Sequence, residues 1–230
     1  MINKNSLIGV VSRSFTKSAE LRKHLELTFT NVKYNDDLLH FDENGLIEFI
    51  KDCDAVIVSE DLISKKVIDS LPKLKSVCKF GVGLDNIDID YLNEKKIYLG
   101  WKPGINSSSV AELALSYIIL MLREAYQLNR ELLNSKWQKV SNSRDLSDMT
   151  IGVIGYGHIG KKLIDYLTPH ESKILIYDPL MEPNKTISDY VRSTSLEFLL
   201  MNSDAISIHV PLLDGTVNLI GEKELAMMKK

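Results

Sequence analysis

The segment from residue 155 to residue 160 has the residue types and spacing of a loop that binds a dinucleotide. It reads Gly155-Tyr156-Gly157-His158-Ile159-Gly160. Glycines at these positions allow a tight turn, let backbone N–H groups approach a pyrophosphate, and let the following helix pack closely on a strand. The N-terminus of that helix would face the anion with its partial positive charge. A plain strand–turn–helix without a ligand is the alternative interpretation.

An acid stands where such a loop needs one. Asp178 follows Gly160 at close to the spacing of about 20 residues expected of a dinucleotide-binding βαβ unit. Its carboxylate would accept hydrogen bonds from the adenosine ribose. The elements that would position loop and acid are a strand at Thr150–Ile154, the helix that begins in the loop, and a second strand at 174–177. Farther along we expect a helix at 196–201, a strand at 205–210, a loop at 211–214 and a helix at 222–228.

The first hundred residues alternate short apolar runs with helical patterns. Strands are predicted at 7–11, 32–34, 55–58, 76–80 and 97–99, and helices at 18–27, 43–51, 65–70 and 88–95. Short apolar strands separated by helices indicate a parallel sheet covered on both faces. No second glycine-rich fingerprint follows the first strand, so this unit is α/β without a dinucleotide loop of its own.

Residues 101–106 read as a hinge, and the strongest helix pattern of the chain follows them. Ser109 and Glu112 form a predicted capping box. An apolar stripe at helical spacing then predicts a buried connecting helix, although the same stripe would suit a subunit interface. The stripe comprises Val110, Leu113, Ala114, Tyr117, Ile118, Met121, Leu122 and Ala125. Residues 134–148, around Trp137, are polar and irregular and predict an exposed arm.

Composition limits the function classes. The 230 residues are 44% hydrophobic and 26% charged with a formal net charge of -3, which is typical of a globular protein and provides no basic surface for nucleic acid. Cys53 and Cys78 lie in apolar runs and are expected to be reduced thiols rather than a disulfide or a metal site. No signal peptide or membrane-spanning run is recognised. We therefore expect a cytoplasmic protein with no membrane, nucleic-acid or metal partner.

Six motifs in a fixed order carry a family resemblance. They lie at residues 79–88, 106–112, 135–137, 155–160, 177–179 and 209–216. Together they resemble the D-isomer-specific 2-hydroxyacid dehydrogenases, and within them the phosphoglycerate dehydrogenase branch, from about Leu7 to Lys230. The resemblance implies a flavodoxin-like substrate domain at 1–104 and a partial Rossmann domain at 105–230. It also implies NAD as cofactor, a small 2-hydroxy or 2-oxo acid as substrate, and a homodimer.

The resemblance assigns roles to residues of both domains. The implied substrate-binding residues are Lys79, Gly81, Val82, Gly83 and Asn106. The glycine loop would hold the acid's carboxylate on backbone amides, although it could also be an ordinary strand-to-helix turn. Asn106 would help shape the substrate site, although a helix start equally explains an asparagine there.

A larger set is implied to bind the cofactor. It comprises Val110, Gly155, Gly157, His158, Ile159, Gly160, Tyr177, Asp178, Pro179, His209, Val210, Pro211 and Thr216. Val110 would pack near the nicotinamide, and His158 stands where many relatives carry an arginine. His209 could equally be a strand-end histidine, and no general-base role is assigned to it. Because Asp178 would oppose a 2′-phosphate and Pro179 offers no compensating charge, we expect NAD to be preferred over NADP.

Two departures from the family pattern matter. The family's catalytic Arg, Glu and His follow the point at which these residues end, at Lys230. We therefore assign no catalytic residue, expect a Rossmann domain without its C-terminal strands, and predict NAD binding without hydride transfer by the 230 residues. An NAD-binding or regulatory module is the alternative to an incomplete dehydrogenase. The second departure is Ser59-Glu60, where phosphoglycerate relatives often carry Arg-Ser. Glu60 is expected to repel a phosphate, so the substrate stays open.

Overall fold

The computed structural model describes residues 2–139 and 143–229, and its contacts divide the chain into two units. Unit 1 is Met1–Pro103 and unit 2 is Gly104–Lys230. The predicted boundary at residue 104 lies beside this division.

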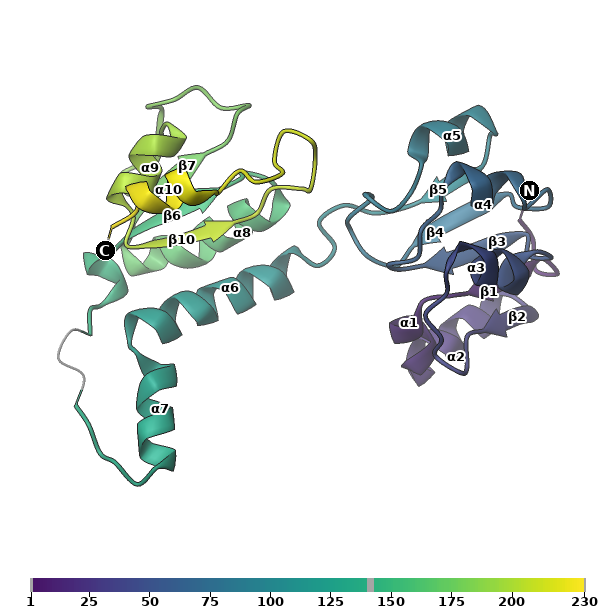
Figure 1. Ribbon diagram of the computed structural model, residues 1–230, viewed down its shortest axis with the longest axis horizontal. Helices are drawn as coiled ribbons and strands as arrows, with labels where there is room; N and C mark the ends of the chain where they lie inside the picture. The colour runs from purple at the N-terminus through teal and green to yellow at the C-terminus, as the bar shows by residue number, and fades with distance from the viewer. Residues whose placement is uncertain (1, 140–142, 230) are drawn as a thin grey trace. The chain divides into compact units, whose positions relative to one another are not determined.

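Unit 1 is built on one parallel sheet. Its strands are β1 (Leu7–Val10), β2 (Asn31–Tyr34), β3 (Ala55–Val58), β4 (Ser76–Lys79) and β5 (Tyr98–Gly100). They lie in the order β2-β1-β3-β4-β5 (Figure 1). This order is that of flavodoxin-like folds, and it confirms the predicted fold class.

The helices of unit 1 begin where short polar side chains cap them. They are α1 (Arg13–Lys17), α2 (Ala19–Thr28), α3 (Glu43–Ile50), α4 (Lys65–Asp69) and α5 (Ile89–Glu94). At the starts of α2 to α5, the side chains of Ser18, Asp42, Ser64 and Asp88 each accept a hydrogen bond from the amide three residues later. The short helix α1 was not predicted.

Unit 2 holds a second, mixed sheet. Its strands are β6 (Thr150–Ile154), β7 (Lys173–Tyr177), β8 (Thr186–Ser188), β9 (Val191–Ser193) and β10 (Ala205–Ile208), in the order β10-β6-β7-β9-β8. The pairs are parallel except β8 with β9. Strands β8 and β9 were missed, because they are three residues long and all of β8 is exposed, which leaves no apolar alternation to read.

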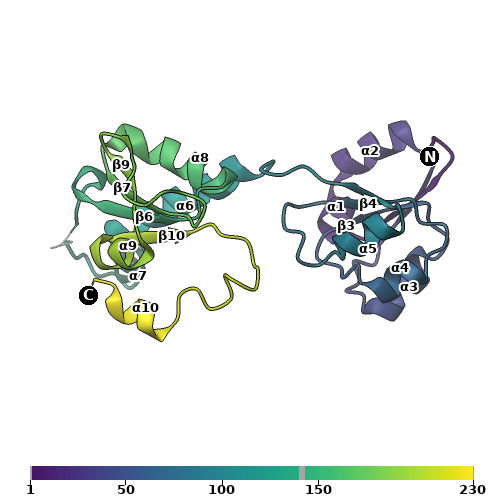
Figure 2. The same ribbon diagram turned by 90° about the horizontal axis from the view of Figure 1, so that it is seen from above.

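Helices α6 (Ser107–Leu122) and α8 (His158–Leu167) pack on one face of this sheet, and α9 (Leu196–Asn202) packs on the other. Helix α7 (Ala125–Leu133) follows α6 and has no buried residue, and α10 (Glu222–Met227) packs beside α9. Short 3-10 turns lie at Leu146–Asp148 and Thr168–His170. Alternate residues of β6 point into two cores: Ile151 and Val153 pack with residues of α6 and α8, whereas Ile154 packs with residues of α9. Helices α6 and α8 accordingly lie on one side of β6 and α9 on the other (Figure 1, Figure 2). The loop predicted to bind a dinucleotide therefore leaves a strand that is buried on both faces.

The start of α6 differs from the prediction. The N-cap is Asn106, and Ser109 lies inside the helix, so the predicted capping box of Ser109 and Glu112 is wrong. The amide of Ser107 donates to the carbonyl of Gly104 at 3.0 Å, and this turn starts the helix three residues early. The helix ends before Glu124, which adopts a left-handed φ of 49°, so Ala125 belongs to α7.

The buried face of α6 agrees with the predicted stripe only in part. Ile118 of the stripe is buried, and Ala114 and Leu122 pack against the same core. Ala111, outside the stripe, is also buried, whereas Leu113, Tyr117 and Met121 are each more than half exposed. Helix α6 is apolar on most sides, so its spacing allows several stripes. Packing against α8 selects the face that carries Ala111 and Ile118.

The predicted arm around Trp137 is described only in part. Trp137 in the predicted arm is exposed, and residues 140–142 of that arm lie outside the described residues. Among the helices that the structure describes, none has the length and apolar character needed to cross a bilayer.

Candidate functional site

The loop between β6 and α8 combines a strained turn, a close packing contact and an open surface. Gly155 has a φ of +98°, a conformation that favours glycine. A Cβ atom on Gly160 would lie 2.0 Å from the carbonyl oxygen of Gly155, so only glycine fits there. A Cβ atom on Gly157, in contrast, would meet nothing within 4 Å. The loop is thus tightly packed at both ends and open in the middle.

The open middle of the loop presents amide donors. Gly157 is the N-cap of α8 and makes no side-chain capping hydrogen bond. The amides of His158 and Ile159 are in the first turn, so they have no carbonyl four residues earlier within the helix. Free amides at the positive end of a ten-residue helix form a site for an anion such as a pyrophosphate.

Asp178 is joined directly to this loop. It follows β7, and its Oδ2 accepts a hydrogen bond of 2.7 Å from the amide of Tyr156 while its Oδ1 accepts one of 2.9 Å from the amide of Leu180. Because a carboxylate oxygen can accept more than one hydrogen bond, both oxygens retain capacity for ribose hydroxyls. Tyr177 is half-buried beside it and Pro179 is exposed.

The segment after β10 reaches the other side of the loop. The amide of His209 donates to the carbonyl of Ile154 at 2.7 Å, and the carbonyl oxygen of His209 lies 2.7 Å from a Cβ placed on Gly155. The His209 ring is 2.8 Å from the Ser207 hydroxyl, and burial lowers the pKa of His209, which favours the neutral ring. The side chain of Val210 lies 3.1 Å from the same Cβ position on Gly155.

Thr216 is engaged within its own loop. Its hydroxyl donates to the carbonyl of Pro211 at 2.6 Å and accepts from the amide of Leu213 at 2.8 Å. Thr216 therefore shapes the 211–216 loop, and Pro211 is exposed on it.

The start of α6 also meets the dinucleotide loop. Gly104 has a φ of +69°, and a Cβ there would lie 2.5 Å from the His158 ring, so the two residues pack together. Asn106 makes no capping hydrogen bond, and its Oδ1 is buried without a partner in the described part of the chain. The helix-start explanation for Asn106 therefore does not account for its side chain. Val110 is half-buried one turn along α6.

In unit 1, the loop after β4 offers a second set of amides. Gly81 has a φ of +147°, and Gly81 and Gly83 are exposed. No backbone carbonyl of the described residues accepts a hydrogen bond from the amides of Gly81, Val82 or Gly83. The carbonyl of Val82 accepts a hydrogen bond of 3.0 Å from the Trp101 indole, which holds the loop from the other side. Three adjacent free amides can bind a carboxylate.

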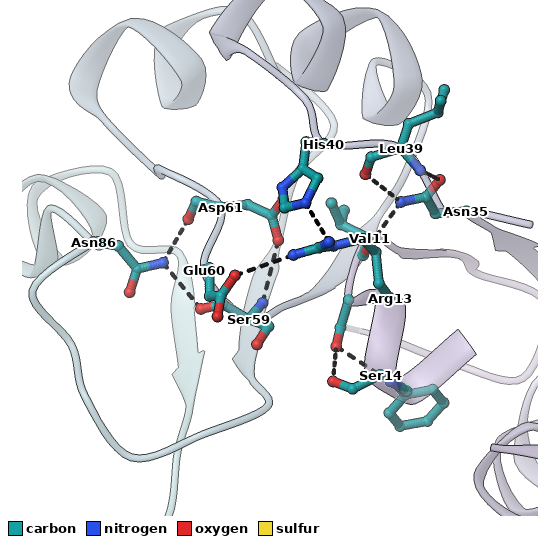
Figure 3. Close-up of polar contacts among 12 residues, drawn as sticks. Val11, Arg13, Ser14, Asn35, Leu39, His40, Ser59, Glu60, Asp61 and Asn86 are labelled. Atoms are coloured by element: carbon teal, nitrogen blue, oxygen red, sulfur yellow. Dashed lines mark hydrogen bonds and ion pairs between the residues drawn. The ribbon is translucent and has the colours of Figure 1, made fainter. Parts of the chain in front are cut away.

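Lys79 is placed to support that loop. Its Nζ donates to the carbonyl of Ser59 and to Oδ1 of Asn86, both at 2.5 Å. The Asn86 side chain in turn donates to the carbonyls of Ser59 and Asp61 at 3.1 Å and 2.5 Å (Figure 3). Burial lowers the pKa of Lys79. Two of the three N–H donors of Lys79 therefore hold the loop after β4 against the end of β3.

Glu60, which the sequence predicts to repel a phosphate, forms an ion pair with an arginine. Its carboxylate accepts a hydrogen bond of 3.2 Å from the Arg13 guanidinium, which also contacts the His40 ring (Figure 3). Arg13, His40 and Trp101 were not singled out from the sequence. The available signal was that Arg13 directly follows a strand, where parallel sheets collect ligand-binding residues.

Comparison with known proteins identifies relatives for both units. Residues 115–230 match the family model described as D-isomer specific 2-hydroxyacid dehydrogenase, NAD binding domain. A hydroxypyruvate reductase of Thermotoga maritima is 32% identical over 83% of this chain and 62% of its own length. A D-3-phosphoglycerate dehydrogenase of Methanocaldococcus jannaschii is 34% identical over 80% of this chain and 36% of its own length. The chain thus spans less than two thirds of the length of these relatives.

A solved structure extends the likeness across the whole chain. The D-lactate dehydrogenase of Aquifex aeolicus, complexed with NAD and lactic acid, superimposes with a TM-score of 0.79 at 26% identity. The match covers 97% of this chain and 66% of that one.

Proposed function

Because the chain belongs to the D-isomer specific 2-hydroxyacid dehydrogenases, with residues 115–230 in their NAD-binding domain, we propose that it serves an oxidoreductase. The reaction moves a hydride between a small 2-hydroxy acid and NAD. The family match confirms the predicted family, fold class and cofactor. The activity and the acid are the proposal. Relatives named as hydroxypyruvate reductase and D-3-phosphoglycerate dehydrogenase support both.

One observation carries this proposal. The loop of Gly155–Gly160 is closed by packing at both ends, open at Gly157, and joined through the Tyr156 amide to the carboxylate of Asp178. A pyrophosphate on the open amides and a ribose diol on Asp178 would use both features at once. A structural turn needs neither the open position nor the acid.

The acid would be held by other groups. We assign the carboxylate of the acid to the free amides of the loop at 81–83. We expect the unpaired Oδ1 of Asn106 to accept a hydrogen bond from a donor group of one of the bound ligands. The nicotinamide supplies the hydride chemistry when bound, and the residues of this chain bind and orient. No proton-transfer residue is assigned.

The test is a calorimetric titration of the protein with NAD, followed by a titration with glyoxylate or hydroxypyruvate in the presence of NADH. We expect saturable NAD binding and binding of the 2-oxo acid. Absence of NAD binding would overturn the proposal. NAD binding with no effect of any 2-oxo acid would favour an NAD-binding module instead.

Asn106 gives a prediction in which stability and binding move separately. A buried acceptor without a partner costs about 1–3 kcal/mol in the unliganded protein. We therefore expect Asn106→Ala to leave the free energy of unfolding unchanged or raised, while the affinity for NAD or for the 2-oxo acid falls. Thermal unfolding and calorimetry of the same sample measure both. A destabilised variant with unchanged affinities would show that Asn106 is only a helix-start residue.

We also propose a homodimer formed through unit 2. Tyr117 and Met121 on α6 and Tyr126 and Leu133 on α7 are more than half exposed. Apolar side chains gathered on neighbouring helices favour a protein partner, and the family resemblance favours a second copy. Tyr117→Glu should convert a dimer to a monomer in light scattering. Leu27→Glu, on α2 in unit 1 and more exposed to solvent than Tyr117, is the control that should not.

A further inference from the structure

Unit 1 has a polar pocket of about 400 Å³ at the carboxyl ends of β1 and β3. These two strands are neighbours, and the chain leaves them toward opposite edges of the sheet, from β1 to β2 and from β3 to β4. Such a topological switch point is where open α/β sheets bind their ligands. The position of this pocket is therefore that of a ligand site rather than of an accidental surface hollow.

The pocket is built around a positioned guanidinium. Arg13 begins α1 directly after β1, and its side chain is about one-third exposed. One of its nitrogens donates to Glu60, which follows β3, and another contacts His40 from the segment after β2 (Figure 3). The segments that follow β1, β2 and β3 thus each contribute one residue to this cluster of Arg13, His40 and Glu60. Such a fixed guanidinium is suited to carboxylate or phosphate recognition.

The charges that line the pocket cancel. Arg13 and Lys17 are the cations, and Glu60 and Asp61 are the carboxylates. The pair of Arg13 and Glu60 is 3.2 Å apart, with the Glu60 side chain 82% exposed. A solvent-exposed pair of this kind contributes little to folding stability. The ion pair instead changes what the pocket can bind, because Glu60 already pairs with the Arg13 guanidinium that an incoming anion would need.

The pocket is tied to the loop assigned to the acid's carboxylate. The carbonyls of Ser59 and Asp61, which flank Glu60, accept hydrogen bonds from Asn86 in the segment that follows Gly81 and Gly83. Strands β3 and β4 are adjacent, so the two strand ends lie at the same edge of the sheet. An acid held at the glycine loop would therefore bind close to this pocket.

We propose that Glu60 is a specificity-determining residue that neutralises an anion site centred on Arg13. The pocket then accepts an uncharged polar substituent, such as a hydroxyl, and rejects a phosphate. This inference rests on the proposed function for the identity of the ligand, but the anion site itself does not. Removal of the Glu60 carboxylate should leave Arg13 and Lys17 opposed by Asp61 alone and open the pocket to phosphate.

The first test uses inorganic phosphate and the whole protein. Phosphate is titrated while the ring signals of His40 are followed by NMR, in the wild-type protein and in Glu60→Gln. We expect Glu60→Gln to bind phosphate about tenfold more tightly, and Arg13→Ala in the same background to remove the gain. Glu48→Gln, a similarly exposed acid outside the pocket, is the matched control and should behave as wild type. No gain in Glu60→Gln, or an equal gain in Glu48→Gln, overturns the anion site.

The second test links the site to the substrate. Glycerate and 3-phosphoglycerate differ only by the phosphate, so the ratio of their affinities measures what this pocket contributes. We expect Glu60→Gln to shift that ratio about tenfold toward 3-phosphoglycerate while glycerate affinity stays constant. A phosphate site in the first test with an unchanged ratio in the second would overturn the role in acid selection. NAD affinity, measured in parallel, reports on the proposed function separately, because the cofactor loop lies in unit 2.

Discussion

Gly160→Ala is expected to destabilise unit 2 strongly, and Gly157→Ala is expected to leave it folded but with a lower affinity for NAD. The two glycines lie in one loop, three residues apart, and differ in what surrounds them. A Cβ on Gly160 would be 2.0 Å from the backbone oxygen of Gly155, which cannot move without shifting the loop from β6. Overpacking against backbone costs about 3 kcal/mol or more, a large share of a domain's stability. Thermal unfolding measures this loss.

Gly157→Ala tests the ligand directly. Gly157 has a φ of -81° and a ψ of -161°, which alanine also adopts, and its Cβ would meet no protein atom within 4 Å. The stability should therefore change by less than about 0.5 kcal/mol. If a pyrophosphate occupies that open space, the methyl group displaces it and weakens hydrogen bonds to a charged group worth about 1.5–3 kcal/mol each. Unchanged NAD affinity in a folded Gly157→Ala protein would contradict the assigned pyrophosphate position.

Much of the fold could be predicted from the sequence, because capping residues mark the helix starts and continuous apolar runs mark the buried strands. In unit 1, Ser18, Asp42, Ser64 and Asp88 stand before helices that were each predicted within two residues. The buried strands read as continuous apolar runs, as parallel strands do. Strands β8 and β9, three residues each with one apolar side chain, carry neither signal. They exist because β9 pairs with β7, a tertiary contact that no local pattern specifies.

Helix α6 shows where helical spacing alone fails. Its sequence is apolar on nearly every side, so the predicted stripe joined a residue of the buried face, Ile118, with exposed residues such as Tyr117 and Met121. Packing on α8 decided the face, and that contact brings together segments about 50 residues apart. The same packing left Leu113, Tyr117 and Met121 of the stripe exposed, and these side chains are the part of α6 that supports the dimer proposal.

In the candidate site, too, the features with a local sequence pattern could be predicted and the long-range contacts could not. Glycine positions and the acid after β7 could be predicted, because the dinucleotide loop is a local chemical pattern. The partners of Glu60 and Lys79 could not. Arg13 and Glu60 are 47 residues apart, and Lys79 and Ser59 are 20 apart, so only the sheet order brings them together. Reading Glu60 alone suggested a repulsive carboxylate, whereas the structure shows a carboxylate that neutralises an arginine.

Asp178 should make the protein prefer NAD over NADP. Its two oxygens accept hydrogen bonds from the amides of Tyr156 and Leu180, which fix the carboxylate beside the glycine loop. A 2′-phosphate placed there would meet a held negative charge, and Pro179 next to it supplies no cation. Close like charges cost several kcal/mol in a poorly solvated site. Calorimetric titrations with both cofactors should therefore show NADP binding at least about tenfold weaker.

Asp178→Asn separates charge from shape. Asparagine can still accept a hydrogen bond from the Tyr156 amide, but its NH₂ group cannot accept the one from Leu180. We expect NAD affinity to fall, since the ribose loses a charged acceptor, and NADP affinity to fall less or to rise. The ratio of the two affinities is the measurement, because any loosening of the loop affects both cofactors. Asp165→Asn removes the same charge from the exposed surface of α8 and should leave the ratio unchanged. An equal loss for both cofactors in Asp178→Asn would show that Asp178 only holds the loop, and cofactor choice would then lie with other residues.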